Sequence, residues 1–180
     1  MIGKNFVARV FAVALVFCAA GLHAAPLRYG FYRAPSATAT PAEQELAFRM
    51  ARYRLLAFAS VFEGTLYLFG GTTAAGMDCS GFVYRSFREA LGVSVPRVSE
   101  SMFLWTERIA REEKQPGDLV FFRTGATARI THVGIYTGDN QFIHSASAGS
   151  RTGVIFSSLS EPYWASVFAG AGRALPSVGR

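Results

Sequence analysis

Cysteine is scarce in this chain of 180 residues, which contains only Cys18 and Cys79. Cleavage of an N-terminal signal, which the first residues predict, would leave Cys79 alone, so the mature chain could form no internal disulfide. An unpaired thiol is a hazard in an oxidising compartment. Cys79 is therefore either a small buried hydrophobic residue, which is the commonest role of free cysteine, or a thiol retained for its reactivity.

Dense basic runs, internal repeats and long low-complexity segments are also absent from the sequence. The formal net charge of +6 falls to +4 once Lys4 and Arg9 are removed with the signal. This pattern gives little support to nucleic-acid binding, whereas a mildly basic surface suits either an anionic polymer such as a bacterial wall or plain solvation. The 51% hydrophobic composition is sufficient for one folded domain of this size.

The first 25 residues have the order of a secretory signal. Two basic residues precede an apolar run at 10–20, and small residues follow it. The run is too short for a comfortable membrane span, so we predict a signal peptide over 1–25 and a periplasmic or secreted location. An uncleaved anchor is one alternative. Lipidation at Cys18 is another, although the preceding Phe17 is larger than a lipoprotein signal prefers.

Three helices are predicted in the first two thirds of the chain. A loose linker over 26–41 leads to a helix over 42–62, and a second helix begins after the N-cap Asp78 and ends at Gly92. A third, shorter helix is predicted over 99–111. One stripe of the first helix is predicted to face the core and consists of Leu46, Met50, Tyr53, Ala57 and Val61.

From Gly117 onward the pattern changes to that of a β-sheet. The runs "DLVFFRT", "HVGIYTG", "QFIHSAS" and "GVIFSSL" are short, rich in β-branched and aromatic residues, and broken by Gly, Asp and Asn. This spacing predicts an antiparallel sheet with a hairpin turn at "TGDNQ". Helices followed by strands indicate an α+β fold rather than alternating βαβ units.

Cys79 stands where the second helix begins, directly after Asp78. The free backbone N–H groups and the positive dipole end of a helix favour the thiolate, so the sequence predicts a lowered thiol pKa and a reactive cysteine. Of three histidines, His23 lies in the signal, while His132 and His144 flank the hairpin turn. Antiparallel pairing would bring these two imidazoles together as a base and an orienter.

Two other interpretations use the same residues. Either histidine taken alone is commonly a satisfied or surface residue. Cys79, His132 and His144 could instead supply three ligands to zinc, although no fourth ligand is apparent in the sequence.

The motifs "YLFGGTTAAGMDCSGFVYRSF", "VPRVSESM", "QPGDLVFFR", "HVGIYTGDNQFIHS" and "GAGR" follow one another over about residues 55–173. In this order they resemble the NlpC-type family of papain-like cysteine peptidases, which cut the peptides of bacterial peptidoglycan. The resemblance implies a papain-like α+β domain over 42–175, with N-terminal helices packed on a C-terminal antiparallel sheet. Leu66 and Phe69 depart from the residues usual in the family and bear on the shape of the pocket.

The resemblance implies a role for each matching catalytic residue. Cys79 corresponds to the nucleophile, His132 to the general base and His144 to the third, orienting member. Tyr67 matches a tyrosine close to the thiol, whose hydroxyl would stabilise the oxyanion together with the Cys79 N–H. The alternative for Tyr67 is a core aromatic residue.

Asp78 and Ser80 match positions that meet the free amine of the substrate's stem peptide in similar enzymes, and Arg97 matches a position near the cleft, so the resemblance implies that all three bind substrate. The alternatives are a plain N-cap for Asp78 and a solvated side chain for Arg97.

The predicted activity is hydrolysis of an amide bond in a stem or cross-link peptide through an acyl-enzyme on Cys79. We expect no cofactor, no nucleic acid, no membrane contact after signal cleavage, and a monomer that acts on peptidoglycan peptides. An amidase or acyl transferase with similar thiol chemistry is an alternative, because the choice of amide depends on loop shape. A non-catalytic wall-binding module is another.

Overall fold

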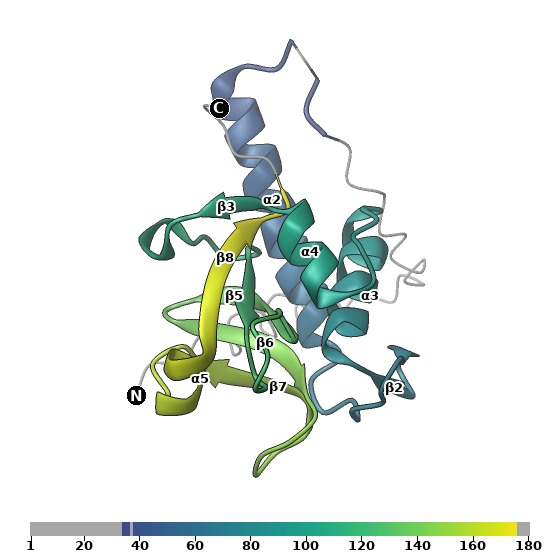
Figure 1. Ribbon diagram of the computed structural model, residues 1–180. Helices are drawn as coiled ribbons and strands as arrows, with labels where there is room; N and C mark the ends of the chain where they lie inside the picture. The colour runs from purple at the N-terminus through teal and green to yellow at the C-terminus, as the bar shows by residue number, and fades with distance from the viewer. Residues whose placement is uncertain (1–33, 37, 176–180) are drawn as a thin grey trace. The chain divides into compact units, whose positions relative to one another are not determined.

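The structure, a computed structural model, describes residues 34–36 and 38–175 (Figure 1). The predicted signal peptide over 1–25 lies outside the described residues, with Cys18 and His23, and so does most of the predicted linker. The boundaries of signal and linker therefore stay predictions. Within the described part of the chain, no helix combines the length and the hydropathy that a membrane crossing requires.

The first described helix, α2 (Pro41–Ser60), confirms the helix predicted over 42–62. The Thr40 hydroxyl accepts the Glu43 backbone N–H, and the Glu43 carboxylate accepts the Thr40 backbone N–H. This reciprocal capping box satisfies backbone donors that would otherwise be unpaired at the helix start.

The core face predicted for α2 is wrong. In the predicted stripe, Leu46 is 59%, Met50 52% and Val61 73% exposed. The buried residues of the helix are Phe48, Ala51, Arg52, Leu55, Leu56 and Ala59. Because α2 carries apolar residues on both faces, periodicity alone does not select the face that meets the rest of the domain.

The second helix, α3 (Cys79–Leu91), begins and ends where the sequence predicts. The Asp78 carboxylate accepts the Gly81 N–H at 2.6 Å, and Gly92 ends the helix in the left-handed conformation with φ 71°. Apolar residues at helical spacing, each at most 1% exposed, anchor the helix in the core: Phe82, Val83, Phe87 and Leu91. The N-terminus of α3 is therefore held on a rigid element.

The helix predicted over 99–111 is too long. The helix α4 (Ser99–Trp105) ends before Thr106, and the chain continues into β3 (Glu107–Ile109) and the 3-10 turn η2 (Arg111–Glu113). Strand β3 pairs antiparallel with β8, which is distant in the sequence. A partner of this kind overrides local propensity, and so the local pattern did not predict the strand.

Six antiparallel strands form one sheet in the order β3-β8-β4-β5-β6-β7. The four predicted strands are β4 (Leu119–Phe122), β5 (His132–Gly138), β6 (Gln141–Ala146) and β7 (Gly153–Ser158). The strand β8 (Phe168–Arg173) has no counterpart in the predicted elements. In the β5–β6 hairpin, Asp139 and Asn140 have φ 49° and 56°, as a tight hairpin turn requires.

Alternating side chains give the sheet two apolar faces. One face packs against α2 and α3 in the main core, through residues such as Phe121 and Ile135. The other face carries a smaller cluster around Phe122 and Phe142, which Trp164 of α5 (Pro162–Val167) covers. In Figure 1, α2, α3 and α4 gather on one side of the strands and α5 lies on the other. The predicted arrangement of helices packed on an antiparallel sheet is confirmed.

Candidate active site

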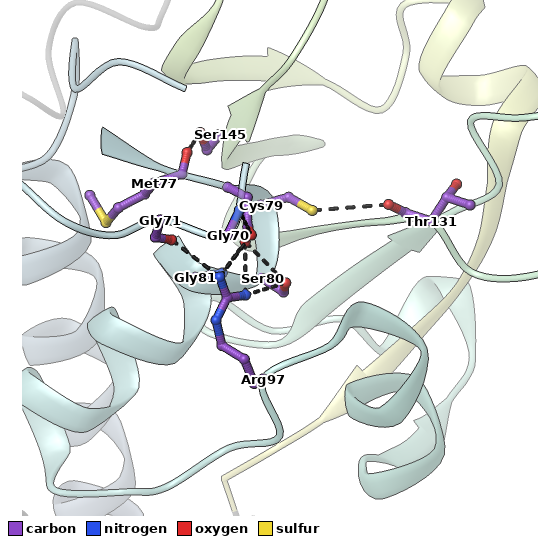
Figure 2. Close-up of polar contacts among 10 residues, drawn as sticks. Gly70, Gly71, Met77, Cys79, Ser80, Gly81, Arg97, Thr131 and Ser145 are labelled. Carbon is purple, nitrogen blue, oxygen red and sulfur yellow. Dashed lines mark hydrogen bonds and ion pairs between the residues drawn. The ribbon is translucent and has the colours of Figure 1, made fainter. Parts of the chain in front are cut away.

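Cys79 is the first residue of α3, and its thiol lies against the start of β5. The Sγ atom is 4.0 Å from the carbonyl oxygen of Thr131, the residue before His132 (Figure 2). Cys79 is 9% exposed. The first turn of α3 therefore lies against the start of β5, the strand that carries His132, although the two elements are distant in the sequence.

The backbone before Cys79 is fixed by two close contacts. A short hairpin of β1 (Thr72–Thr73) and β2 (Gly76–Met77) leads into α3, and the Ser145 hydroxyl of β6 donates to the Met77 carbonyl at 2.7 Å (Figure 2). A Cβ atom on Gly81 would collide with the carbonyl oxygen of Gly71. Glycine at this position lets the preceding loop cross the first turn of the helix closely.

The pKa of Cys79 is raised, contrary to the prediction from its helix position. Burial raises it most and the Asp78 carboxylate adds to the rise, whereas the backbone N–H groups of Val133 and Ser80 oppose it. Because burial prevails, Cys79 is a protonated thiol near neutral pH. It can act as a nucleophile only if a neighbouring base accepts its proton.

His132 opens β5 and His144 lies in β6, and the prediction that they are neighbours is confirmed. Nε2 of His132 and Nδ1 of His144 form a hydrogen bond of 2.9 Å. Nδ1 is the nitrogen of His132 that takes no part in this bond. A Cβ atom on Gly134 would lie 2.7 Å from Phe142 Cδ2 and 3.1 Å from His144 Cβ. Glycine on β5 therefore leaves the space that the two aromatic side chains of β6 fill.

Both imidazoles are buried and neutral near pH 7. Burial lowers the pKa of His132 to about 4. Burial first, and then the charge of His132, lowers the pKa of His144 well below its ordinary value. A neutral imidazole has one nitrogen lone pair that can accept a proton, so His132 has the form that a general base needs.

Ser157 and Trp164 also contact the histidines, and no sequence pattern pointed to either of them. Nε2 of His144 is 3.1 Å from the Ser157 hydroxyl of β7. The Trp164 ring of α5 stacks on His132 with centroids 5.3 Å apart and meets His144 edge-on at 4.8 Å. The run "GVIFSSL" predicted a strand, but only its register against β6 decides which serine faces the histidine.

Asp78, Ser80 and Arg97 form one hydrogen-bonded cluster next to the thiol. Arg97 Nη1 donates to Asp78 Oδ1 at 2.9 Å and to Ser80 Oγ at 2.8 Å, and Nη2 donates to Asp78 Oδ2 at 2.7 Å (Figure 2 shows Arg97 reaching toward Ser80). The backbone N–H groups of Gly70 and Gly81 donate to the same carboxylate at 2.8 and 2.6 Å. Burial alone would raise the pKa of Asp78, but the hydrogen bonds from Arg97 and Gly81 hold it below its ordinary value. The N-cap role of Asp78 is confirmed.

A pocket of about 440 Å³ opens over the thiol and the Asp78 cluster, within the usual range of ligand sites. Tyr67 lines it, and burial, followed by the charges of Cys79 and Asp78, raises the pKa of this tyrosine. Phe69, 88% exposed, and Val98, 56% exposed, add apolar surface. The lining residues are Tyr67, Phe69, Gly70, Asp78, Cys79, Ser80, Arg97, Val98, Ser99 and Thr131.

The model of the NlpC/P60 family matches residues 64–173, more than half of the chain, and this range holds the thiol, both histidines and the Asp78 cluster. The chain belongs to the NlpC/P60 family.

The proteins to which this chain is similar include a murein endopeptidase and a solved member of the NlpC/P60 family. The murein DD-endopeptidase MepS/murein LD-carboxypeptidase of Escherichia coli (strain K12) is 46% identical over 114 residues, which cover 63% of this chain and 58% of that relative. The chain thus spans little more than half of that relative's length. A solved NlpC/P60 family protein from Bacillus cereus is 32% identical with a TM-score of 0.62, over 69% of this chain and 40% of that one.

The NlpC/P60 fold is shared at lower identity as well. RipD from Mycobacterium tuberculosis, described as a non-catalytic NlpC/P60 domain protein adapted to peptidoglycan binding, is 19% identical with a TM-score of 0.57. The match covers 69% of this chain and 98% of RipD. At this identity the likeness concerns the fold alone.

The described part of this NlpC/P60 domain contains no group of three or more His, Cys, Asp or Glu side chains that could hold a metal ion. His132 and His144 direct ring nitrogens at each other instead. The alternative of a zinc site on Cys79 and the two histidines therefore lacks a ligand set in these residues.

Proposed function

We propose that this chain is a secreted cysteine endopeptidase that hydrolyses amide bonds in the stem or cross-link peptides of bacterial peptidoglycan. One observation carries the proposal. Cys79 lies in an open pocket against the start of the strand that bears His132, and His132 is hydrogen-bonded to His144. A thiol, a base and a group that orients the base are the parts that nucleophilic catalysis by cysteine needs.

In the first half of the proposed reaction, the Cys79 sulfur attacks the peptide carbonyl carbon while the thiol proton moves to Nδ1 of His132. The imidazolium is held by its Nε2–H, which donates to Nδ1 of His144. It then protonates the leaving amine, the C–N bond breaks, and a thioester remains on Cys79.

In the second half, His132 accepts a proton from water as the water oxygen attacks the thioester carbonyl. The new carboxyl group leaves when the C–S bond breaks, and the imidazolium returns its proton to the sulfur of Cys79. No cofactor takes part in the proposed cycle, and the protein is proposed to act as a monomer.

The negative oxygen that forms in both halves requires hydrogen-bond donors. We assign the backbone N–H of Cys79 and the hydroxyl of Tyr67 to this role, because Tyr67 lines the same pocket as Cys79 and a protonated tyrosine hydroxyl can donate. Asp78, Ser80 and Arg97 are proposed to hold the substrate peptide. Since both Asp78 oxygens already accept from Arg97, this wall of the pocket offers a paired charge rather than a bare carboxylate.

The substrate class rests on the relative that is named a murein DD-endopeptidase and on a pocket lined by both polar and apolar groups. Action on the wall requires export, for which the order of residues in 1–25 supplies a signal, followed by the linker over 26–41 and the peptidase domain over 42–175. Mature protein isolated from cell-envelope fractions should begin near Ala25 on N-terminal sequencing. An intact Met1 on cytosolic protein would contradict export.

The decisive test of the chemistry is Cys79→Ala. Digestion of purified muropeptides, followed by mass spectrometry of the products, should show at least about a 1000-fold loss of kcat/KM and would identify the amide that is cut. The melting temperature should stay close to that of the wild type. Ser86→Ala is a matched control, because Ser86 lies on the same helix and is buried away from the pocket. Wild-type turnover by the Cys79 variant would exclude the mechanism.

The two histidines should contribute unequally to the activity. His132→Ala removes both the proton acceptor and the donor to the leaving amine, whereas His144→Ala leaves both functions present but misaligned. We therefore expect the larger loss from His132→Ala, and partial recovery in His144→Asn or His144→Gln, whose amides can still hydrogen-bond His132. A larger loss from His144→Ala would reverse the assignment of base and orienter.

A further inference from the structure

Both ring nitrogens of His144 are engaged. Nδ1 is 2.9 Å from His132 Nε2, and Nε2 is 3.1 Å from the hydroxyl of Ser157. The three residues belong to β5, β6 and β7, which are consecutive strands of the sheet. His144 is completely buried and Ser157 is 6% exposed, so bulk water does not compete for these contacts.

The direction of the hydrogen bonds that link His132, His144 and Ser157 follows from the proposed role of His132 as a general base. To accept the thiol proton, the neutral His132 ring needs its lone pair on Nδ1, and its hydrogen is then on Nε2. His132 Nε2–H donates to Nδ1 of His144, so His144 must carry its own hydrogen on Nε2. That hydrogen points at Ser157, whose hydroxyl oxygen accepts it.

We propose that Ser157 is a positioning residue: by accepting the Nε2–H of His144, its hydroxyl supports the tautomers in which His132 carries its lone pair on Nδ1. The proposal rests on the function proposed above. Without the hydroxyl, Nε2–H of His144 would be a buried donor with no partner, which is costly. Moving that hydrogen to Nδ1 relieves the cost, but His132 must then carry its hydrogen on Nδ1 and can no longer accept a proton from the thiol.

The strand register explains why Ser157 has this role and Ser158 does not. Phe142 pairs with Ser157, and His144 pairs with Ile155. Ser157 therefore lies diagonally across from His144 on the same face of the sheet. Successive side chains alternate between faces, and the Ser158 hydroxyl contacts the Asn140 carbonyl oxygen at 3.4 Å instead.

The test compares Ser157→Ala, Ser157→Thr and the matched control Ser158→Ala in the full mature protein. Long-range proton–nitrogen NMR of isotope-labelled histidine reports which ring nitrogen carries the hydrogen, independently of activity. In the wild type, both His132 and His144 should carry it on Nε2. Ser157→Ala should show a mixture of tautomers and a kcat/KM about 10- to 100-fold lower. Ser157→Thr keeps the hydroxyl and should recover the wild-type tautomer and most of the activity.

Several outcomes would overturn the proposal. They are a wild-type His144 with its hydrogen on Nδ1, a Ser157→Ala variant with unchanged tautomers, and a Ser157→Ala variant with shifted tautomers but the kcat/KM of Ser158→Ala. If Ser157→Ala does not fold, the tautomer of the wild type and the measurements on Ser157→Thr still test the proposal. Failure of the proposed function is distinguishable, because it would appear as wild-type turnover by Cys79→Ala whatever the tautomers are.

Discussion

The Asp118 cluster and the Asp78 cluster both pair a carboxylate with arginine, and they differ in what surrounds the pair. Asp118 has no exposed surface and lies 3.2 Å from Arg52 and 2.9 Å from Arg173, whose side chains are 9% and 5% exposed. Asp78 is paired at 2.7 Å with Arg97, whose side chain is 35% exposed and lines the pocket over the thiol.

The difference separates a structural pair from a candidate functional one. The Asp118 cluster joins Arg52 of α2 to Arg173 of β8 and also accepts the Gln115 N–H at 2.7 Å. The Asp78 cluster holds the first turn of α3 and at the same time faces an open pocket. Residue type is the same in both, so the surroundings of a charged pair, rather than its composition, indicate which one can meet a substrate.

The largest expected effect on stability comes from Asp118→Asn. This change removes a buried negative charge that lies within 3.2 Å of two arginine side chains, and breaking a buried ion pair costs about 3–5 kcal/mol of unfolding free energy. Urea denaturation measures this loss, and activity per folded molecule should be unchanged. If Asp118→Asn were as stable as the wild type, the distinction between the two clusters would fail.

The second largest effect on the unfolding free energy is expected from acid. His132 has a pKa of about 4 in the folded protein and about 6.5 when unfolded, so between these values the unfolded chain binds more protons. The unfolding free energy is therefore complete above pH 6.5 and should fall by up to about 3 kcal/mol as pH drops to about 4. His144, whose pKa is also lowered by burial, acts in the same direction. A His132→Asn, His144→Asn double variant should lose this slope, and an unchanged slope would contradict the burial of neutral imidazoles.

Asp78→Asn should have a smaller effect on stability and a distinct one on reactivity. Asparagine is also a good N-cap, so the unfolding free energy should change by only about 1 kcal/mol. Because the charge of Asp78 helps to raise the pKa of Cys79, its removal should lower the pH midpoint of iodoacetamide labelling. Glu100→Gln, which removes a carboxylate outside the pocket lining, is the control. A midpoint that does not move would mean that Asp78 has no electrostatic effect on the thiol.

The smallest effect is expected where a charged pair lies at the surface. Arg129 contacts Glu100 at 2.6 Å, but the arginine side chain is 74% exposed. Solvent and salt screen such a pair, so Arg129→Gln should leave both the denaturation midpoint and the activity unchanged. A clear loss of stability would show that the exposure of a charged pair does not predict its contribution to the unfolding free energy.

Local features of the sequence were sufficient for part of the site. Asp78 as N-cap, Gly92 as the helix end and the Asp139–Asn140 turn were all predictable, because each depends on the backbone preferences of a few adjacent residues. The hairpin in turn predicted that His132 and His144 are neighbours. The matching motifs pointed to the family and to the residues proposed here as catalytic.

The tertiary structure alone decided the remainder. The buried face of α2, the strand β3 and the contacts of Ser157 and Trp164 depend on partners far away in the sequence, and local periodicity carries no information about them. The pKa of Cys79 is the clearest case. Its position at a helix start predicted a lowered value, but burial between α3 and β5 raises it, because removal from water penalises the charged form more than the neighbouring N–H groups favour it.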